Sequence, residues 1–182
     1  MKKLIVCLTG MPGAGKSTVV MKLKEHGYEI FNLGDGVRAE AKRRNLEPTG
    51  KNLGKLMLEL REKNGPGAIA QLIKDPIQNS SERIIIIDGV RSIPEIDVLT
   101  DIGDVKLLAI KASPTTRFNF LSLRRRSDDP LSKESFNERD NRELGVGLGK
   151  TIDLADETIE NENVTIEQLV SSAIKIFQNW IK

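Results

Sequence analysis

The chain has 182 residues, a length typical of one α/β domain with a single core. Its 28 lysines and arginines nearly balance 26 aspartates and glutamates, so the net charge of +2 gives no reason to expect a generally basic surface for nucleic acid or membranes. Cys7 is the only cysteine, which excludes an internal disulfide and a thiolate zinc cluster and favours a reducing cytosol. The basic, apolar start is too short to cross a bilayer and has no cleavage site, so we expect a cytoplasmic protein.

Apolar segments alternate with amphipathic ones along the chain. The apolar run at 3–9 predicts a strand that is buried on both faces, and four consecutive isoleucines at 84–87 favour another inner parallel strand. The predicted strands are 3–9, 28–33, 83–89, 105–112 and 157–160. The predicted helices are 16–27, 34–45, 51–63, 68–77, 94–99, 115–126 and 165–182. This alternation predicts an α/β fold with a doubly wound, five-stranded parallel sheet.

The segment 127–145 begins as a polar loop and continues as a charged helix with little to bury. This composition favours a mobile lid, which we place at 124–145. The glycines that follow at 145–149 come after a helix rather than a strand, so we interpret them as a flexible connection and not as a dinucleotide-binding motif. We expect one domain over 1–182.

The stretch "GMPGAGKST" at 10–18 carries the most specific motif of the chain. It satisfies G-x-x-x-x-G-K-[ST] and lies between a predicted strand and a predicted helix, the context in which this pattern forms a phosphate-binding loop. Its amides would converge on phosphate oxygens, Lys16 would reach the outer phosphates, and Ser17 would ligate magnesium. The predicted ATP-binding residues are Gly10, Met11, Pro12, Gly13, Ala14, Gly15, Lys16, Ser17 and Thr18.

Asp88 ends the isoleucine strand and precedes a glycine. An acid at this position can hold magnesium beside the phosphate loop, although Asp-Gly also forms ordinary turns. We therefore predict ATP and Mg²⁺ as cofactors, with Ser17 and Asp88 as the metal-binding residues.

Arginines gather at predicted loops and helix ends. Transfer of a phosphoryl group between two anions needs cations around both, and planar guanidinium groups fork onto phosphate. Each arginine alone is typical of a solvated surface, but the set favours a phosphate clamp. The set comprises Arg38, Arg91, Arg117, Arg124, Arg125, Arg126, Arg139 and Arg142.

These segments resemble the nucleoside monophosphate kinases, in particular adenylate kinase. The phosphate loop is similar to theirs, "LGDGVRAE" at 33–40 to their acceptor-side segment, and "DGVR" at 88–91 to their Asp-Gly-Phe-Pro-Arg segment. The resemblance implies that Arg38 and Arg91 grip the acceptor phosphate, that Asp35 flanks it, and that Asp88 orients magnesium through water. It also implies that 34–77 is an acceptor-binding insertion.

The second half is more similar to dephospho-coenzyme A kinase. The segment 123–143 resembles its arginine-bearing lid, and 155–169 its last strand and helix. The whole pattern is similar to an archaeal group of adenylate-kinase-related proteins. Two departures from adenylate kinase are that "DGVR" lacks the Phe-Pro pair and that the lid has no zinc cysteines.

The sequence thus predicts a P-loop nucleoside triphosphate hydrolase fold of the nucleoside monophosphate kinase type and an ATP-dependent kinase with AMP as the favoured acceptor. We expect Lys16, Arg91, Arg124 and Arg126 to be catalytic, and Asp35, Arg38, Arg91 and Arg139 to bind the acceptor. Two alternatives stay open: a kinase for dephospho-coenzyme A or another small alcohol, and a nucleotide-sensing ATPase or binding module that acts on a protein or RNA partner. We expect a small-molecule nucleotide as partner, without membrane or nucleic acid, and leave the oligomeric state open.

Overall fold

The computed structural model describes residues 2–124, 129–130 and 132–182. Within these ranges, parallel strands form a sheet with the order β2-β3-β1-β4-β5. The strands are β1 (Lys3–Thr9), β2 (Glu29–Asn32), β3 (Ile84–Asp88), β4 (Gly103–Lys111) and β5 (Glu157–Glu160). The predicted five-stranded parallel sheet is therefore confirmed.

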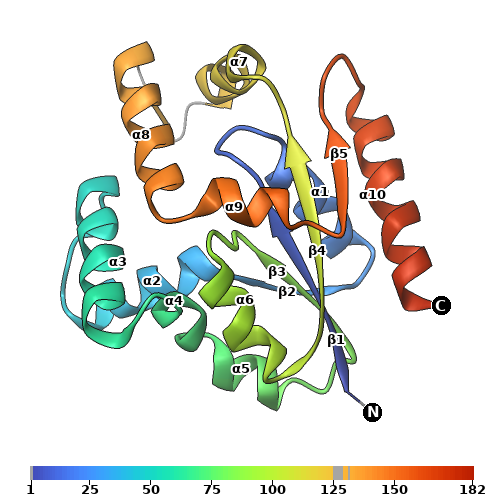
Figure 1. The fold of residues 1–182 in the computed structure, drawn as a ribbon, viewed down its shortest axis with the longest axis horizontal. Coiled ribbons are helices and arrows are strands. Elements are labelled where there is room, and N and C mark those ends of the chain that lie inside the picture. The colour runs from blue at the N-terminus through green and yellow to red at the C-terminus, as the bar shows by residue number, and fades with distance from the viewer. Residues whose placement is uncertain (1, 125–128, 131) are drawn as a thin grey trace.

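Helices connect the strands and cover the sheet (Figure 1). They are α1 (Lys16–Glu25), α2 (Leu33–Arg43), α3 (Gly50–Asn64), α4 (Ala68–Gln71), α5 (Lys74–Asn79), α6 (Ile93–Thr100), α7 (Pro114–Arg124), α8 (Lys133–Gly145), α9 (Leu148–Asp153) and α10 (Ile166–Ile181). No helix in the described ranges combines the length and the apolar character that a membrane span requires.

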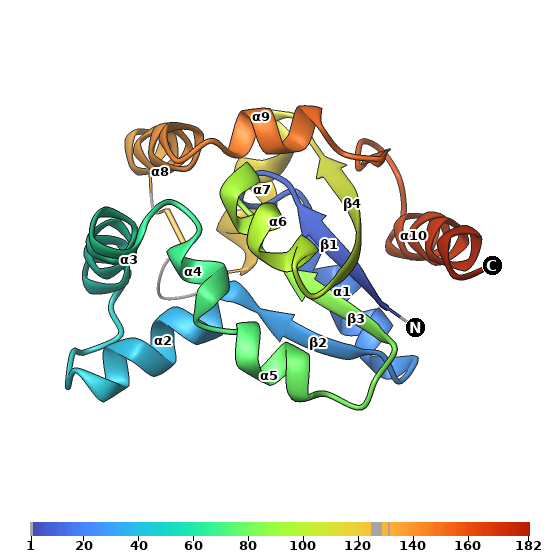
Figure 2. The same ribbon diagram turned by 60° about the horizontal axis from the view of Figure 1, so that its bottom comes forward.

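The side chains of β1 contribute alternately to two hydrophobic cores, one on each face of the sheet, because successive side chains of a strand point to opposite faces. Ile5 and Cys7 join a buried cluster with residues of α2 to α6. Val6 and Leu8 join a second cluster with residues of α1 and α10. Figure 2 shows α6 and α10 on opposite sides of the sheet. The strands are therefore covered on both faces, as their unbroken apolar runs predict.

The carboxyl ends of the strands lie at one edge of the sheet because all strand pairs are parallel. Central β1 pairs with β3 on one side and with β4 on the other, so the chain moves in opposite directions from this strand. Ligands of open α/β sheets bind at such a switch point, outside the carboxyl ends of the strands. Figure 1 shows the arrows of β1 and β4 pointing toward α7.

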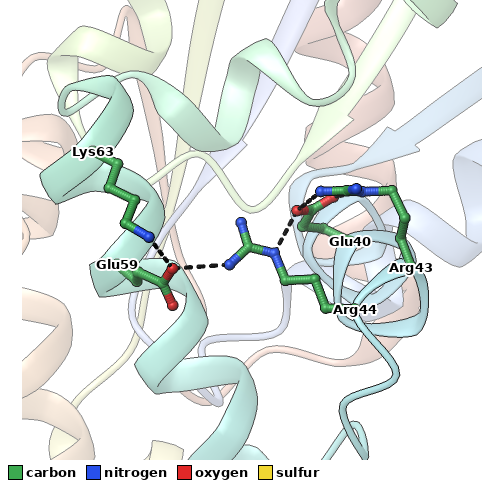
Figure 3. A network of polar contacts seen from close by, with 5 residues as sticks. All are labelled: Glu40, Arg43, Arg44, Glu59 and Lys63. Carbon is green, nitrogen blue, oxygen red and sulfur yellow. Dashed lines mark hydrogen bonds and ion pairs between the residues drawn. The ribbon is translucent and has the colours of Figure 1, made fainter.

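A network of charged side chains joins α2 to α3 (Figure 3). Glu40 accepts hydrogen bonds from Arg43 Nε at 2.7 Å and from Arg44 Nε at 2.6 Å. Arg44 also donates to Glu59 at 2.9 Å, and Lys63 donates to the same carboxylate at 2.8 Å. The network fastens two helices of the predicted acceptor-binding insertion to each other.

Two sequence predictions about helices were wrong. The expected helix at 68–77 is two helices, α4 and α5, because the ring of Pro76 would clash with the carbonyl of Leu72 in a continuous helix. The expected flexible connection at 145–149 instead contains the start of α9. Leu148 of α9 is buried against Ala109 of β4, which stabilises this short helix.

Helix α8 buries more than its charged sequence predicts. Its buried side chains are Phe136 and Glu143. The ring of Phe136 packs edge-on against Phe118 of α7 with 5.5 Å between ring centroids, and the Arg117 guanidinium lies 4.9 Å from its centroid. This packing fixes α8 beside α7.

Candidate active site

A cavity of about 730 Å³ lies at the carboxyl edge of the sheet. The turns after β1, β2, β3 and β5 line it together with side chains from α7 and α8. The predicted site residues among its lining are Gly10, Pro12, Gly13, Gly15, Lys16, Ser17, Thr18, Arg38, Asp88, Arg91, Arg124 and Arg139. The fold therefore brings together residues from distant parts of the sequence.

The phosphate loop (residues 10–18) turns sharply between β1 and α1, and its three glycines all have a positive φ. Gly10 has a φ of 142°, and a Cβ there would lie 2.2 Å from the carbonyl oxygen of Ile110. Gly15 is the left-handed N-cap of α1 with a φ of 105°, and its Cβ would lie 2.5 Å from Asn161 Nδ2. Side chains at either position would strain the loop and displace its neighbours.

Lys16 is folded back over its own loop. Its Nζ donates to the carbonyl oxygens of Gly10 at 2.5 Å and Met11 at 3.1 Å. Burial lowers the pKa of Lys16 to about 8, and the carboxylate of Asp88 partly opposes this effect. The charge of a phosphate group beside the ammonium would favour its protonated form. Two loop residues do not line the cavity, since Ala14 is fully buried and Met11 packs near α9.

Asp88 ends β3 directly beside the last residue of β2, Asn32. Asn32 Nδ2 donates to Asp88 Oδ2 at 2.7 Å. Burial raises the pKa of Asp88, and the charge of Lys16 opposes this rise. Both Asp88 and the hydroxyl residue Ser17 line the cavity.

This pair of oxygen donors fits Mg²⁺, because magnesium keeps several waters and usually takes one or two protein ligands plus substrate phosphates. The described residues contain no group of three or more histidine, cysteine, aspartate or glutamate side chains that could hold a metal by themselves. Ser17 and Asp88 would hold the ion only together with a bound polyphosphate.

Arg91 follows Asp88 by three residues and contacts two separate helices. Its Nε forms an ion pair with Glu143 of α8 at 3.0 Å, and its Nη1 donates to the sulfur of Met57 of α3 at 3.1 Å. Its backbone amide donates to the fully buried Glu95 at 2.8 Å. The Arg91 side chain is thus held between α3 and α8.

Arg38 lies on α2, within the predicted acceptor-side segment 33–40. Its Nη2 forms an ion pair with Asp35 Oδ1 at 2.5 Å, and both side chains are more than half exposed. Arg38 lines the cavity, whereas Asp35 is not part of the lining.

The buried carboxylate of Asp129 gathers two more arginines. Arg124 Nε of α7 donates to Asp129 Oδ2 at 3.0 Å, and Arg139 Nη1 of α8 lies 3.6 Å from Asp129 Oδ1. Both arginines line the cavity. Arg126, together with Arg125, lies outside the described residues.

Two arginines of the predicted clamp point elsewhere. Arg117 is only 3% exposed, binds both carboxylate oxygens of Asp140, and donates to the carbonyl oxygen of Pro12 at 3.0 Å. It therefore ties the phosphate loop to α8. Arg142 is exposed on α8 and is not part of the cavity lining.

Four polar residues of the cavity were missed in the sequence: Asn32, Glu143, Asn161 and Thr165. Asn161 follows β5 and donates from Nδ2 to the carbonyl oxygen of Ala14 at 3.0 Å, so it braces the phosphate loop. Asn32 and Asn161 each sit where a parallel strand ends, and this position is a signal that could have identified them. Glu143 gives no such signal, because it is one of many charges on α8.

Comparison with known proteins relates the chain to one family. Residues 9–137 match the family model of the AAA domain. A UPF0200 protein of Hyperthermus butylicus is 39% identical over 174 residues, which cover 96% of this chain and 93% of that protein. A UPF0200 protein of Methanocaldococcus jannaschii is 42% identical over 161 residues, which cover 87% of this chain and 82% of that protein.

Solved structures share the fold at low sequence identity. The crystal structure of TT1252 from Thermus thermophilus superposes with a TM-score of 0.74 at 16% identity and covers 100% of both chains. Shikimate kinase from Bacteroides thetaiotaomicron superposes with a TM-score of 0.61 at 15% identity, covering 96% of this chain and 98% of that one. The predicted P-loop kinase fold is thus confirmed, and the chain belongs to the UPF0200 family.

Proposed function

We propose that this protein transfers the terminal phosphoryl group of ATP to a nucleoside monophosphate, with AMP as the favoured acceptor. The observation that carries the proposal is that one cavity is lined both by the phosphate loop and by Arg38 and Arg91. A site that only hydrolyses ATP has no need for cations beyond the donor phosphates, whereas phosphoryl transfer between two anions does.

On the donor side, the amides of the phosphate loop and Lys16 would hold the β- and γ-phosphates. Ser17 and Asp88 would hold Mg²⁺, which neutralises charge on the transferring group when it is bound. Four exposed apolar side chains in the cavity lining suit the flat face of a purine. They are Phe120 and Leu123 of α7, Val164 before α10, and Ile166 at the start of α10.

On the acceptor side, Arg38 and Arg91 would grip the monophosphate. Each guanidinium is paired with a carboxylate, Asp35 or Glu143, so a dianionic phosphate would compete with that carboxylate. Phosphate offers stronger, two-pronged hydrogen bonds to guanidinium, which favours the exchange.

In the proposed reaction, an oxygen of the acceptor phosphate attacks the γ-phosphorus while the bond to the β–γ bridging oxygen breaks. The products are ADP and a nucleoside diphosphate. The nucleophile is already ionised at neutral pH, so no general base is needed, and positioning and charge supply the acceleration. Arg124, Arg126 and Arg139 would stabilise charge on the transferring group, with closure of residues 124–145 excluding water.

A second candidate is phosphorylation of an alcohol, such as dephospho-coenzyme A. The observation that favours it is the carboxylate of Glu143, which is buried, lines the cavity and pairs with Arg91. A hydroxyl acceptor must lose a proton, and a carboxylate within reach could take it.

An ADP-formation assay with ATP, Mg²⁺ and a panel of acceptors tests the proposal. The panel contains the common nucleoside monophosphates and dephospho-coenzyme A, and we expect turnover that depends on AMP. Lys16→Met should lower kcat about 10²- to 10³-fold, because it removes a cation from the transferring phosphates. The matched control is Lys22→Met, which removes an ammonium on the same helix that pairs with Glu25 at 2.7 Å instead.

Each outcome of this assay decides between the candidates. Turnover with dephospho-coenzyme A alone would replace the nucleotide acceptor by an alcohol. Tight ATP binding without any acceptor-dependent turnover would refute the kinase and favour a nucleotide-sensing module. In that case, strongly salt-dependent retention of RNA would point to a nucleic-acid partner.

A further inference from the structure

We propose that Asn32 is a positioning residue that fixes the Asp88 carboxylate relative to the acceptor-side helix α2. The proposal rests on the proposed function, because it assigns Asn32 a role in the same phosphoryl transfer. It is carried by the two hydrogen bonds that the Asn32 side chain makes in opposite directions.

The sheet places Asn32 next to Asp88. The two residues are the last partners in the parallel pairing of β2 with β3, although 56 positions separate them in the sequence. Directly opposed residues on neighbouring strands share a face of the sheet. Their side chains therefore meet at the floor of the cavity, which both residues line.

The side-chain amide of Asn32 forms a hydrogen bond with its nitrogen and another with its oxygen. Nδ2 donates to Asp88 Oδ2 at 2.7 Å, while Oδ1 accepts from the backbone amide of Asp35 at 3.3 Å and caps α2. A carboxylate accepts hydrogen bonds on both oxygens, so a donor on Oδ2 fixes its plane and leaves Oδ1 for another partner. Asn32 thus orients Asp88 and begins α2 at the same time.

Asparagine suits this position better than the other capping residues. Aspartate would cap α2 equally well but would place a second carboxylate against Asp88. Serine and threonine also cap helices, but their side chains are shorter and carry a single hydroxyl for two partners. Only asparagine, among the common caps, offers a donor and an acceptor on separate atoms.

Packing around the cap supports a fixed geometry. A Cβ at Gly34 would lie 2.9 Å from Asn32 Oδ1 and 3.4 Å from Arg38 Nη1. Glycine at 34 therefore lets the Asn32 amide and the Arg38 guanidinium approach the same turn of backbone. A displacement of α2 by a bound acceptor would act on Asp88 through this turn.

The test separates capping from the positioning of Asp88. Asn32→Ser keeps a capping hydroxyl but removes the donor to Asp88. We expect this variant to fold with the wild-type circular dichroism spectrum and to lose kcat about 10- to 100-fold with little change in KM for AMP, as happens when partners of metal-binding side chains are removed. Asn32→Asp should lose at least as much, since it adds charge beside Asp88.

The matched control is Thr49→Ala. Thr49 caps α3 through a hydrogen bond from the Asn52 amide at 3.2 Å and is exposed, so the variant loses a cap but no contact with Asp88. We expect Thr49→Ala to lower kcat much less than Asn32→Ser does. Equal losses in Asn32→Ser and Thr49→Ala would mean that Asn32 is only a cap, and would overturn the proposal.

A second readout does not depend on turnover. Calorimetric titration of ATP with and without Mg²⁺ gives the gain in affinity that the metal provides, and we expect Asn32→Ser to reduce this gain about tenfold. An unchanged gain together with an unchanged kcat would refute the role of Asn32. If no acceptor is phosphorylated by the wild type, the kinase proposal fails, yet this titration still decides whether Asn32 positions Asp88.

Discussion

The environment of Glu143 leads to a specific prediction about the affinity for the acceptor. Glu143 is 5% exposed, lines the cavity, and forms an ion pair with Arg91 Nε at 3.0 Å. An acceptor phosphate must take Arg91 from this carboxylate. Glu143→Gln should therefore tighten AMP binding about fivefold, because releasing Arg91 from its partner costs about 1 kcal/mol. Isothermal titration of AMP in the absence of ATP measures this effect.

The control for this prediction lies on the same helix. Glu138 is exposed on α8, so Glu138→Gln removes the same charge away from Arg91 and should leave AMP binding unchanged. Weaker AMP binding by Glu143→Gln would show instead that the carboxylate holds Arg91 in place for the acceptor.

At the scale of elements, the pairing of α2 with α3 depends on the ionised carboxylate of Glu40. Hydrogen bonds from Arg43 and Arg44 lower the pKa of Glu40 to about 2 (Figure 3). Because this pKa lies below the ordinary value of 4.5, the network stabilises the fold above about pH 4.5 and is lost as the pH falls toward 2. Glu40→Gln should thus lower the free energy of unfolding by about 1 kcal/mol at neutral pH.

Urea denaturation of wild type and Glu40→Gln at several pH values checks this prediction. The difference between them should shrink as the pH falls below about 4.5. Glu62→Gln is the control, since Glu62 is an exposed glutamate of α3 that the network does not contain. A difference that stays constant between neutral pH and pH 2 would contradict an ionic origin.

At the scale of the whole molecule, Arg117 connects segments that are far apart in the chain. It binds Asp140 of α8, donates to the carbonyl oxygen of Pro12 in the phosphate loop, and packs on Phe136. Arg117→Met should lower the free energy of unfolding by about 3 kcal/mol, because Asp140 would keep a largely buried charge without its partner. It should also weaken ATP binding, since the phosphate loop loses the hydrogen bond from Arg117 to Pro12.

Chemical denaturation and nucleotide titration measure these two effects. Arg117→Lys should restore neither the wild-type stability nor the wild-type ATP affinity completely. Lysine cannot form both hydrogen bonds to Asp140 and one to Pro12 in the same geometry. Arg142→Met is the control, since Arg142 is exposed on α8. An equal stability of Arg117→Met and Arg142→Met would show that the buried contacts of Arg117 do not hold the two helices together.

The sequence allowed the sheet and the phosphate loop to be predicted because both depend on local patterns. Buried parallel strands require continuous apolar runs, and a loop that wraps a phosphate requires glycines and a lysine at fixed spacing. The arginine set was predictable only in part. Arg38, Arg91, Arg124 and Arg139 line the cavity. Arg117 belongs to the same predicted set but is buried against Asp140. The residue type does not determine in which direction a side chain points from its helix.

The sequence by itself therefore determined a doubly wound parallel sheet and a loop with the phosphate-binding motif, since each follows from the spacing of neighbouring residues. Only the tertiary structure decided that Asn32 lies beside Asp88, that Glu143 pairs with Arg91, and that α9 forms against β4. These contacts join segments that are distant in sequence. They depend on strand register and helix packing, which fix distances that no local pattern specifies.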